Sequence, residues 1–293
     1  MLTTQMHFEK SLVIPTLKLR WFTCNCYQFI LPNGKSILTD PFLPAPDSVG
    51  WQFPEHYCGY LPEDLGSLDY VILNHTHGDH IGTLPEIYNM YLPRIFGHVG
   101  YAYQLCLDLD IPQRKVFPYE NEHTYHFNDF TLETFTARHG GPENPKPPSA
   151  MVQGGPADKF TVLNQYGTLF NTDFILTTSQ GVRIGFCSGV FDENERYEWK
   201  DAKIDVLIRQ CPEFMRSGDY AELAEQFMGT GAKILLPLHH EHPYDHHKPY
   251  DQIDCVKFVE NVNTYLAEKE YIGRMILLER GKWYNLTTGI FCE

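Results

Sequence analysis

The stretch LDYVILNHTHGDHIG, residues 68–82, places an apolar run directly before a cluster of histidines. The run Tyr70–Leu73 predicts a short buried strand. The positions after it hold three histidines and one aspartate: His75, His77, Asp79 and His80. Ligand sites in open α/β sheets lie at the carboxyl ends of strands, and Gly78 permits a sharp turn there. Imidazole and carboxylate together suit Zn²⁺, and also Mn²⁺ or Fe²⁺, so the stretch predicts a metal site.

The composition is that of one ordered globular protein. Of the 293 residues, 43% are hydrophobic and 14% are aromatic, and the chain is long enough to bury a sizeable core. Acidic residues outnumber basic ones by 37 to 23, which gives a net charge of −14. Nucleic acids and anionic membranes bind through clusters of Lys and Arg, so this balance argues against both as main partners. We expect a single domain over residues 1–293, and a homo-oligomer is compatible with it.

Cysteine usage and the apolar runs predict a cytoplasmic protein with no integral membrane segment. The eight cysteines are scattered and only Cys24 and Cys26 are close together, which is typical of buried reduced thiols. The longest apolar runs, such as KILLPL at 233–238, are strand-sized and too short to span a bilayer. The N-terminus MLTTQMHFEK lacks the basic start and apolar core of a secretory signal.

Short β-rich runs occur in two sets along the chain, with helical patterns between them. Turn signals bound several of these runs: PNGK at 32–35, FNDF at 127–130 and SQGV at 179–182. A further strand is predicted by RMILLER at 274–280. Two sets of strands with intervening helices predict two sheets packed face to face and covered outside by helices. Pattern alone leaves the class as α/β or α+β.

Three helices are indicated by periodicity and capping. Over residues 251–268, apolar residues recur at spacings of three and four: Ile253, Val256, Val259, Val262 and Leu266. Asp219 with Glu222 is a capping pattern ahead of LAEQFM. The run TLPEIYNMY, which follows the histidine cluster, predicts a third helix with Pro85 in its first turn.

HTHGDH after LDYVILN resembles the signature of the metallo-β-lactamase superfamily of hydrolases. The resemblance continues in chain order through four more segments: GKSILTDPFL at 34–43, TFTARHGG at 134–141, TTSQGVRIGFCSG at 177–189 and AKILLPLHHEH at 232–242. The sequences of the Asp-Pro strand and of TARH most resemble those of the branch that contains ascorbate-6-phosphate lactonase and the N-acyl phosphatidylethanolamine phospholipase. The resemblance implies an α+β fold, a four-layer αββα sandwich of two mixed β-sheets flanked by helices, with the site on one rim.

Carried over by position, the resemblance implies two sets of metal ligands. The first ion would be held by His75, His77 and His139, and the second by Asp79, His80 and His239. His240 is a rival to His239, because both directly follow the last strand. Asp40 would orient a ligand from behind, as metal-bound histidines usually require.

The sequence departs from the family pattern at one position. The family expects an aspartate that bridges both metals after the glycine of CSG, and Val190 stands there. Valine cannot bind a metal ion. Asp192 is the candidate to reach in instead, with Glu193 the weaker one, and a solvated loop acid is the alternative role for Asp192. Without such a carboxylate the second ion would be weakly held or absent.

The resemblance implies a metal-dependent hydrolase that uses a metal-bound hydroxide on a small ester, lactone or phosphoester. We expect Zn²⁺ as one or two ions, and Asp79 as the residue that orients the attacking water. Two alternatives stay open: a diiron enzyme that handles oxygen, and a binding or sensing protein of the same fold with impaired catalysis. Loops at 43–66 and 140–160 are expected to shape the substrate pocket.

Overall fold

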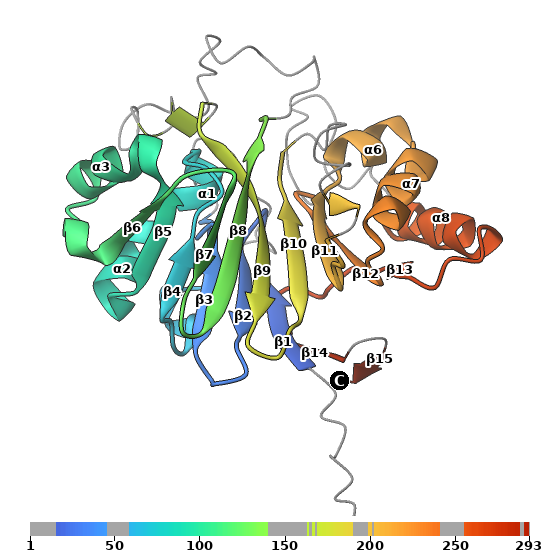
Figure 1. The fold of residues 1–293 in the computed structure, drawn as a ribbon, viewed down its shortest axis with the longest axis horizontal. Helices are drawn as coiled ribbons and strands as arrows, with labels where there is room; N and C mark the ends of the chain where they lie inside the picture. Colours follow the sequence, from blue (N-terminus) through green and yellow to red (C-terminus); the bar gives the residue numbers. More distant parts are fainter. Residues whose placement is uncertain are drawn as a thin grey trace, which may run out of the picture.

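The computed structural model describes residues 16–45, 59–139, 163, 166–167, 169–189, 199–200, 202–240, 255–287 and 290–292. These residues form two β-sheets that lie between two groups of helices (Figure 1). The expected αββα arrangement of two mixed sheets is therefore confirmed. Because both sheets are covered, most of their strands are buried on both faces.

The first sheet contains eight strands of the described chain, in the order β15-β14-β1-β2-β3-β4-β5-β6. Their bounds are β1 Thr16–Trp21, β2 Tyr27–Ile30, β3 Ser36–Thr39, β4 Tyr70–Ile72, β5 Arg94–His98, β6 Val116–Tyr119, β14 Tyr284–Thr287 and β15 Ile290–Cys292. Strand β3 runs parallel to β4, so their carboxyl ends meet at one rim of the sheet. Antiparallel pairing of β14 with β1 brings the end of the chain back to its start.

The second sheet contains seven described strands, in the order β13-β12-β11-β10-β9-β8-β7. Their bounds are β7 His123–His126, β8 Phe130–Ala137, β9 Asn171–Thr178, β10 Arg183–Cys187, β11 Val206–Gln210, β12 Ile234–Leu238 and β13 Arg274–Met275. Strands β10, β11 and β12 are parallel to one another. Their carboxyl ends therefore also share one rim.

Helices cover the outer face of each sheet. On the first sheet lie α1 Gly78–Ile81, α2 Leu84–Tyr91 and α3 Val99–Asp108, with the 3₁₀ turns η3 Pro62–Leu65 and η4 Gln113–Lys115. On the second sheet lie α6 Pro212–Ser217, α7 Tyr220–Thr230 and α8 Cys255–Glu268. In Figure 1, α2 and α3 lie on one flank and α6, α7 and α8 on the other. None of the described helices combines the length and the apolar character needed to cross a lipid bilayer.

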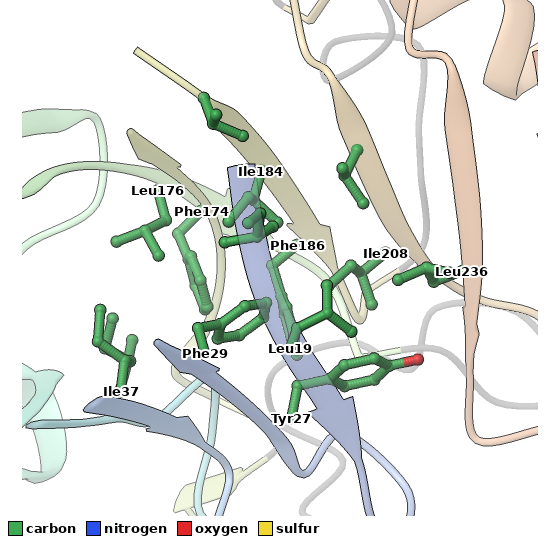
Figure 2. Close-up of a cluster of buried hydrophobic side chains, with 14 of the residues drawn as sticks. Leu19, Tyr27, Phe29, Ile37, Phe174, Leu176, Ile184, Phe186, Ile208 and Leu236 are labelled. Atoms are coloured by element: carbon green, nitrogen blue, oxygen red, sulfur yellow. The ribbon is translucent and has the colours of Figure 1, made fainter. Parts of the chain in front are cut away.

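The main core lies between the two sheets, where aromatic and branched side chains from both interdigitate (Figure 2). Phe29 and Tyr27 from β2 stack with ring centroids 6.2 Å apart, and Tyr27 meets Phe186 of β10 edge to face. Phe186 in turn stacks on Phe174 of β9 at 4.8 Å. Burial of these rings removes a large apolar area from water and fixes how the sheets face each other.

The turn signals in the sequence correspond to hairpins, as predicted. The PNGK turn joins β2 to β3, with Ile30 paired to Ser36 and Gly34 at a positive φ of 85°. The FNDF turn joins β7 to β8, and the SQGV turn joins β9 to β10. The predicted strand over 274–280 is too long, because only Arg274–Met275 pairs with β12. Beyond it the chain crosses to the first sheet, where Gly281 N–H donates to Trp21 O.

The predicted helix starts are confirmed for α7 and α2. Asp219 caps α7 by accepting a hydrogen bond from Glu222 N at 3.2 Å. Helix α2 begins with a proline in its first turn. The predicted apolar face of α8 is partly wrong, because Val256 is 62% exposed. The buried face is formed by Phe258, Val262 and Leu266, since burying an aromatic ring removes more apolar area from water than burying a valine.

This orientation of α8 predicts opposite outcomes for two substitutions. Leu266→Ala removes a side chain that is 1% exposed and should lower the free energy of unfolding by about 2–5 kcal/mol. Val256→Ala should change it by no more than about 0.5 kcal/mol. Urea denaturation of both variants measures the difference. Equal losses would mean that α8 presents the face predicted from periodicity.

Candidate metal centre

The predicted site residues are carried by segments that follow strands from both sheets. Asp40 directly follows β3, and the stretch His75–His80 follows β4 and opens α1. From the second sheet, His139 follows β8 and His239 directly follows β12. Helix α1 lies at the upper rim of the sheets in Figure 1. The αββα packing therefore brings site residues from four parts of the chain to one rim.

Three histidines converge on a single point. His75, His77 and His139 each offer a ring nitrogen, and these nitrogens all lie within 4.8 Å of one another. The ring centroids are 4.8 Å apart for His75 and His77, 4.5 Å for His77 and His139, and 5.2 Å for His75 and His139. All three pairs meet edge to face. This arrangement suits nitrogen lone pairs that share one cation better than it suits ring stacking.

Asn74 sets the tautomer of His75. The Nδ1 atom of His75 lies 2.8 Å from Asn74 Oδ1, so Nδ1 carries the proton and donates it to the amide oxygen. The other ring nitrogen, Nε2, is left with a lone pair. It is buried and has no hydrogen-bond partner among the described residues. An orphaned buried acceptor that faces two further imidazoles fits a metal ligand.

The amide of Asn74 is itself held by four groups. Its oxygen also accepts from the Ser188 hydroxyl, while its nitrogen donates to Thr172 O and, at 3.3 Å, to Asp173 Oδ1. Asp173 Oδ1 also accepts the backbone N–H groups of Ser188 at 2.9 Å and Gly189 at 3.2 Å. These bonds leave one orientation for the amide, with oxygen toward His75. Sequence reasoning missed this network, whose only local signal is an asparagine directly before the first histidine.

His77 packs directly against a glycine. A Cβ atom added to Gly167 would lie 2.3 Å from Cδ2 and 2.8 Å from Nε2 of His77. The neighbouring Thr76 hydroxyl donates to Leu163 O at 2.5 Å. Residues 163 and 167 therefore form a wall over the histidine stretch. Position 167 in this wall has room only for glycine.

Burial keeps two of the three imidazoles neutral. Desolvation lowers the pKa of His75 and of His77 well below the usual value, and the neighbouring histidines lower both further. A neutral imidazole is the form that binds a metal ion. The donor set thus fits a divalent cation without any change of protonation at these two positions.

A second group of donors lies beside the three histidines. Cys24, Asp79 and His239 each offer one ligand atom, and these atoms lie within 4.8 Å of one another. All three side chains are buried. The sequence predicts Asp79 and His239 as ligands of a second ion and Cys24 as a buried thiol. Its neighbours are far from it in the chain, so no spacing motif could have revealed it.

His80 lies between two carboxylates. Its Nδ1 is 2.9 Å from Asp40 Oδ2, and its Nε2 is 3.4 Å from Asp79 Oδ2. Burial lowers the pKa of His80, but the two carboxylates outweigh burial and raise the pKa to about 9. Asp40 therefore contacts a proposed ligand from behind, as expected. Within the described residues, His80 belongs to neither group of donors with mutual distances under 4.8 Å.

His239 and His240 point to different surroundings. His239 Nδ1 lies 3.9 Å from Asp79 Oδ2 and within the second donor group. His240 packs its ring on Trp21, with centroids 4.4 Å apart. Burial lowers the pKa of His240 to about 4. Of the two rivals, His239 is the one whose ring nitrogen faces the site.

Several predicted positions lie outside the described residues. These are Val190, Asp192 and Glu193, together with most of the two loops expected to shape the pocket. Within the 43–66 loop, Tyr60 is described. It packs edge to face on Phe22 at 5.3 Å and donates a hydrogen bond to Arg280 O. Tyr60 therefore contributes to packing between η3 and the first sheet.

Comparison with known sequences points to the same family as the histidine motif. Residues 35–169 match the family described as "Beta-lactamase superfamily domain". This range contains five of the proposed ligands: His75, His77, Asp79, His80 and His139. A UPF0173 metal-dependent hydrolase of Thermodesulfovibrio yellowstonii is 33% identical over 70 residues. That match spans 24% of this chain and 24% of the relative.

Solved structures share the fold over nearly the whole chain. An isothiocyanate hydrolase from Delia radicum gut bacteria aligns with a TM-score of 0.60 at 15% identity, over 92% of this chain and 99% of that one. The metallo-β-lactamase fold protein YhfI of Bacillus subtilis aligns with a TM-score of 0.56 at 15% identity, over the same shares of 92% and 99%. The chain therefore has the metallo-β-lactamase fold.

The same fold also occurs in a larger diiron enzyme. CmlA, a diiron β-hydroxylase from Streptomyces venezuelae, aligns with a TM-score of 0.54 at 11% identity. The alignment covers 92% of this chain and 54% of CmlA.

The contact between residue 167 and His77 predicts a specific defect. In Gly167→Ala the new methyl group must displace the His77 ring, so metal affinity at the three-histidine cluster should fall by about 10–100-fold. Isothermal titration with Zn²⁺ measures the loss.

Gly229→Ala is the matched control for this substitution. It places the same methyl group in helix α7, where no atom lies within 4 Å, and it should leave metal affinity unchanged. Equal affinities in the two variants would contradict the close packing of His77.

Proposed function

We propose that this chain is a metal-dependent hydrolase whose centre is the histidine cluster at the rim of the two sheets. The observation that carries the proposal is the convergence of His75, His77 and His139, whose ring nitrogens lie within 4.8 Å of one another. The orphaned Nε2 of His75 supports it, because that buried lone pair needs a partner. The relative from T. yellowstonii carries the name metal-dependent hydrolase, which agrees with this function.

The proposed ligands form two sets. The first ion is assigned to His75, His77 and His139, and the second to Asp79, His80 and His239. The sequence offers Asp192 as one candidate for the donor that is missing at Val190. Zn²⁺ is the expected ion, since imidazole and carboxylate suit it, while Mn²⁺ and Fe²⁺ are accepted by the same groups. When bound, a divalent cation lowers the pKa of a coordinated water from about 15.7 towards about 7 and polarises the bond to be broken.

Asp79 is the proposed catalytic residue. Its buried carboxylate lies with Oδ2 at 3.4 Å from His80 Nε2 and 3.9 Å from His239 Nδ1. Held in this way, an Oδ atom of Asp79 can orient the attacking water and accept its proton. Asp40 holds His80 at 2.9 Å and acts through it, so Asp40 is a positioning residue.

The proposed substrate is a small ester, lactone or phosphoester. The resemblance of the Asp-Pro strand and of TARH to the lactonase and phospholipase branch supports this class. The net charge of −14 disfavours nucleic acid. Leu163 and Gly167 close one side of the cluster, where they contact Thr76 and His77.

A diiron enzyme that handles oxygen is the alternative, because the diiron hydroxylase CmlA has the same fold. Metal analysis separates the two. Two zinc or manganese ions with turnover of esters or lactones support the hydrolase, whereas two irons with redox activity support the alternative. A metal-loaded protein without turnover on any substrate of the panel would favour a binding role.

Two substitutions test the proposed roles. His77→Ala and Asp79→Asn should each lower kcat/KM at least about 100-fold on an ester, lactone and phosphoester panel. His77→Ala acts by loss of the first ion, while Asp79→Asn removes the proton acceptor together with a ligand of the second ion and leaves the first ion in place. Steady-state kinetics with parallel metal analysis separates the two causes.

The control for these variants is His126→Ala. His126 is exposed near the far end of the β7–β8 hairpin, where Nδ1 contacts Thr131 Oγ1 at 3.2 Å. The variant should keep full activity. Turnover that survives in His77→Ala at the level of this control would rule out the three-histidine cluster as the catalytic centre.

Metal removal should also lower thermal stability. A ligand that binds only the folded state at about 100 times its Kd adds about 2.7 kcal/mol. For a domain of this size we expect a fall in Tm of about 5 °C or more after chelation, reversed by Zn²⁺. Differential scanning fluorimetry measures it. In His77→Ala the response to added Zn²⁺ should shrink, and a response equal to that of the unmodified chain would place the stabilising ion elsewhere.

A further inference from the structure

Cys24 lies in the second donor group although it comes from a distant turn. Its Sγ is among three ligand atoms, with those of Asp79 and His239, that lie within 4.8 Å of one another. The exposed fraction is 0% for Cys24 and 3% for each of the other two. A thiol, a carboxylate and an imidazole from three separate elements thus share one buried spot.

The surroundings of Cys24 differ from those of the other cysteines. Cys26 and Cys106 belong to the apolar cluster between the first sheet and its helices, and Cys187 and Cys211 belong to the cluster on the second sheet. Cys255 packs against that same second cluster. Cys24 is in none of the three apolar clusters of the described residues. Hydrophobic packing therefore accounts for these five cysteines, whereas Cys24 is buried outside the apolar clusters of the described residues.

The turn that carries Cys24 is tied to the rim from two sides. The carbonyl oxygen of Cys24 accepts from Trp21 Nε1 at 3.3 Å and from the backbone N–H of His239 at 3.5 Å. The next residue, Asn25, donates from Nδ2 to Asp40 Oδ2 at 3.2 Å. The thiol is therefore held against the end of β12 and the end of β3 by bonds that do not involve sulfur.

The backbone conformation of Cys24 and His239 also indicates a constrained site. Cys24 and His239 both adopt positive φ values, 44° and 51°. Side chains other than glycine rarely adopt this conformation, and it persists where surrounding structure enforces it, often at ligand sites. The two strained residues are the ones joined by the backbone hydrogen bond.

We propose that Cys24 is a ligand of the second metal ion, in which its thiolate joins Asp79 and His239 and replaces the carboxylate that the family pattern expects at Val190. This inference rests on the proposed metal centre. As the sulfur–metal bond forms, the thiol proton is released to solvent. A thiolate donor selects Zn²⁺ or Fe²⁺ at this position over Mn²⁺ or Mg²⁺, which prefer oxygen ligands.

Cobalt substitution tests the assignment directly. Apoprotein titrated with Co²⁺ should bind about two ions per chain and develop the near-ultraviolet charge-transfer band of a thiolate–cobalt bond. In Cys24→Ser the band should vanish and the stoichiometry should fall to about one ion. Cys106→Ala, which removes a buried thiol from an apolar cluster, should keep the band and both ions.

Two further variants keep the test decisive. Cys24→Asp retains an anionic donor, so it should bind the second ion without the charge-transfer band even if Cys24→Ser folds poorly. Asp192→Ala should keep the band and both ions. The proposal would be overturned if the band persisted in Cys24→Ser or if the wild-type protein bound Co²⁺ without any such band. It would also be overturned if the second ion were lost in Asp192→Ala but kept in Cys24→Ser.

Hydrolysis is measured separately on the Zn²⁺-loaded protein, so the two proposals fail independently. A thiolate band in a protein without turnover would leave Cys24 as a ligand and remove the hydrolase assignment. Turnover in a protein without the band would support the hydrolase assignment and remove Cys24 as a ligand.

Discussion

The side chain and backbone of Asn74 join the two sheets at the rim that carries the histidines. Its backbone N–H donates to Asp40 Oδ1 at 2.7 Å within the first sheet, and its backbone carbonyl accepts from Thr172 N at 3.1 Å in the second. Its amide adds bonds to His75, Ser188, Thr172 and Asp173. A buried amide with all four of its hydrogen-bonding positions filled has one orientation. The lone pair of His75, and with it the three-histidine geometry, follows from that orientation.

The polar rim depends on the apolar core beneath it. The rings of Tyr27, Phe174 and Phe186 set how the sheets face each other, and the carboxyl ends of β4, β10 and β12 then lie near one another. A buried cluster of imidazoles and carboxylates costs desolvation free energy, which hydrogen bonds and a cation must offset. Asp40 illustrates the offset, because its buried carboxylate accepts three hydrogen bonds, from Asn74, Asn25 and His80.

Much of this arrangement could be predicted from the sequence because it is encoded locally. Strands, hairpin turns and the caps of α2 and α7 depend on neighbouring residues, and the HTHGDH motif places four donors within six positions. The buried face of α8 could not be predicted fully from periodicity, because packing against the second sheet buries Phe258 and leaves Val256 exposed. Cys24 and Gly167 were missed as site residues because their partners lie far away in the chain. Asn74 was missed because the groups that fix its amide, on Thr172, Asp173 and Ser188, come from the second sheet. No periodicity or spacing records a contact between a turn after β1 and the end of β12.

The route of the chain has a consequence for how the protein folds. The donors at the rim come from the β1–β2 turn, the start of α1, the end of β8 and the end of β12, and β1 itself pairs with β14 near the C-terminus. Contacts between residues so far apart in the chain form late, since the entropy of closing long loops must be lost first. A metal ion therefore meets its full set of ligands only after both sheets have docked. Binding of the ion by this full set of ligands therefore adds its free energy to the docked state of the two sheets.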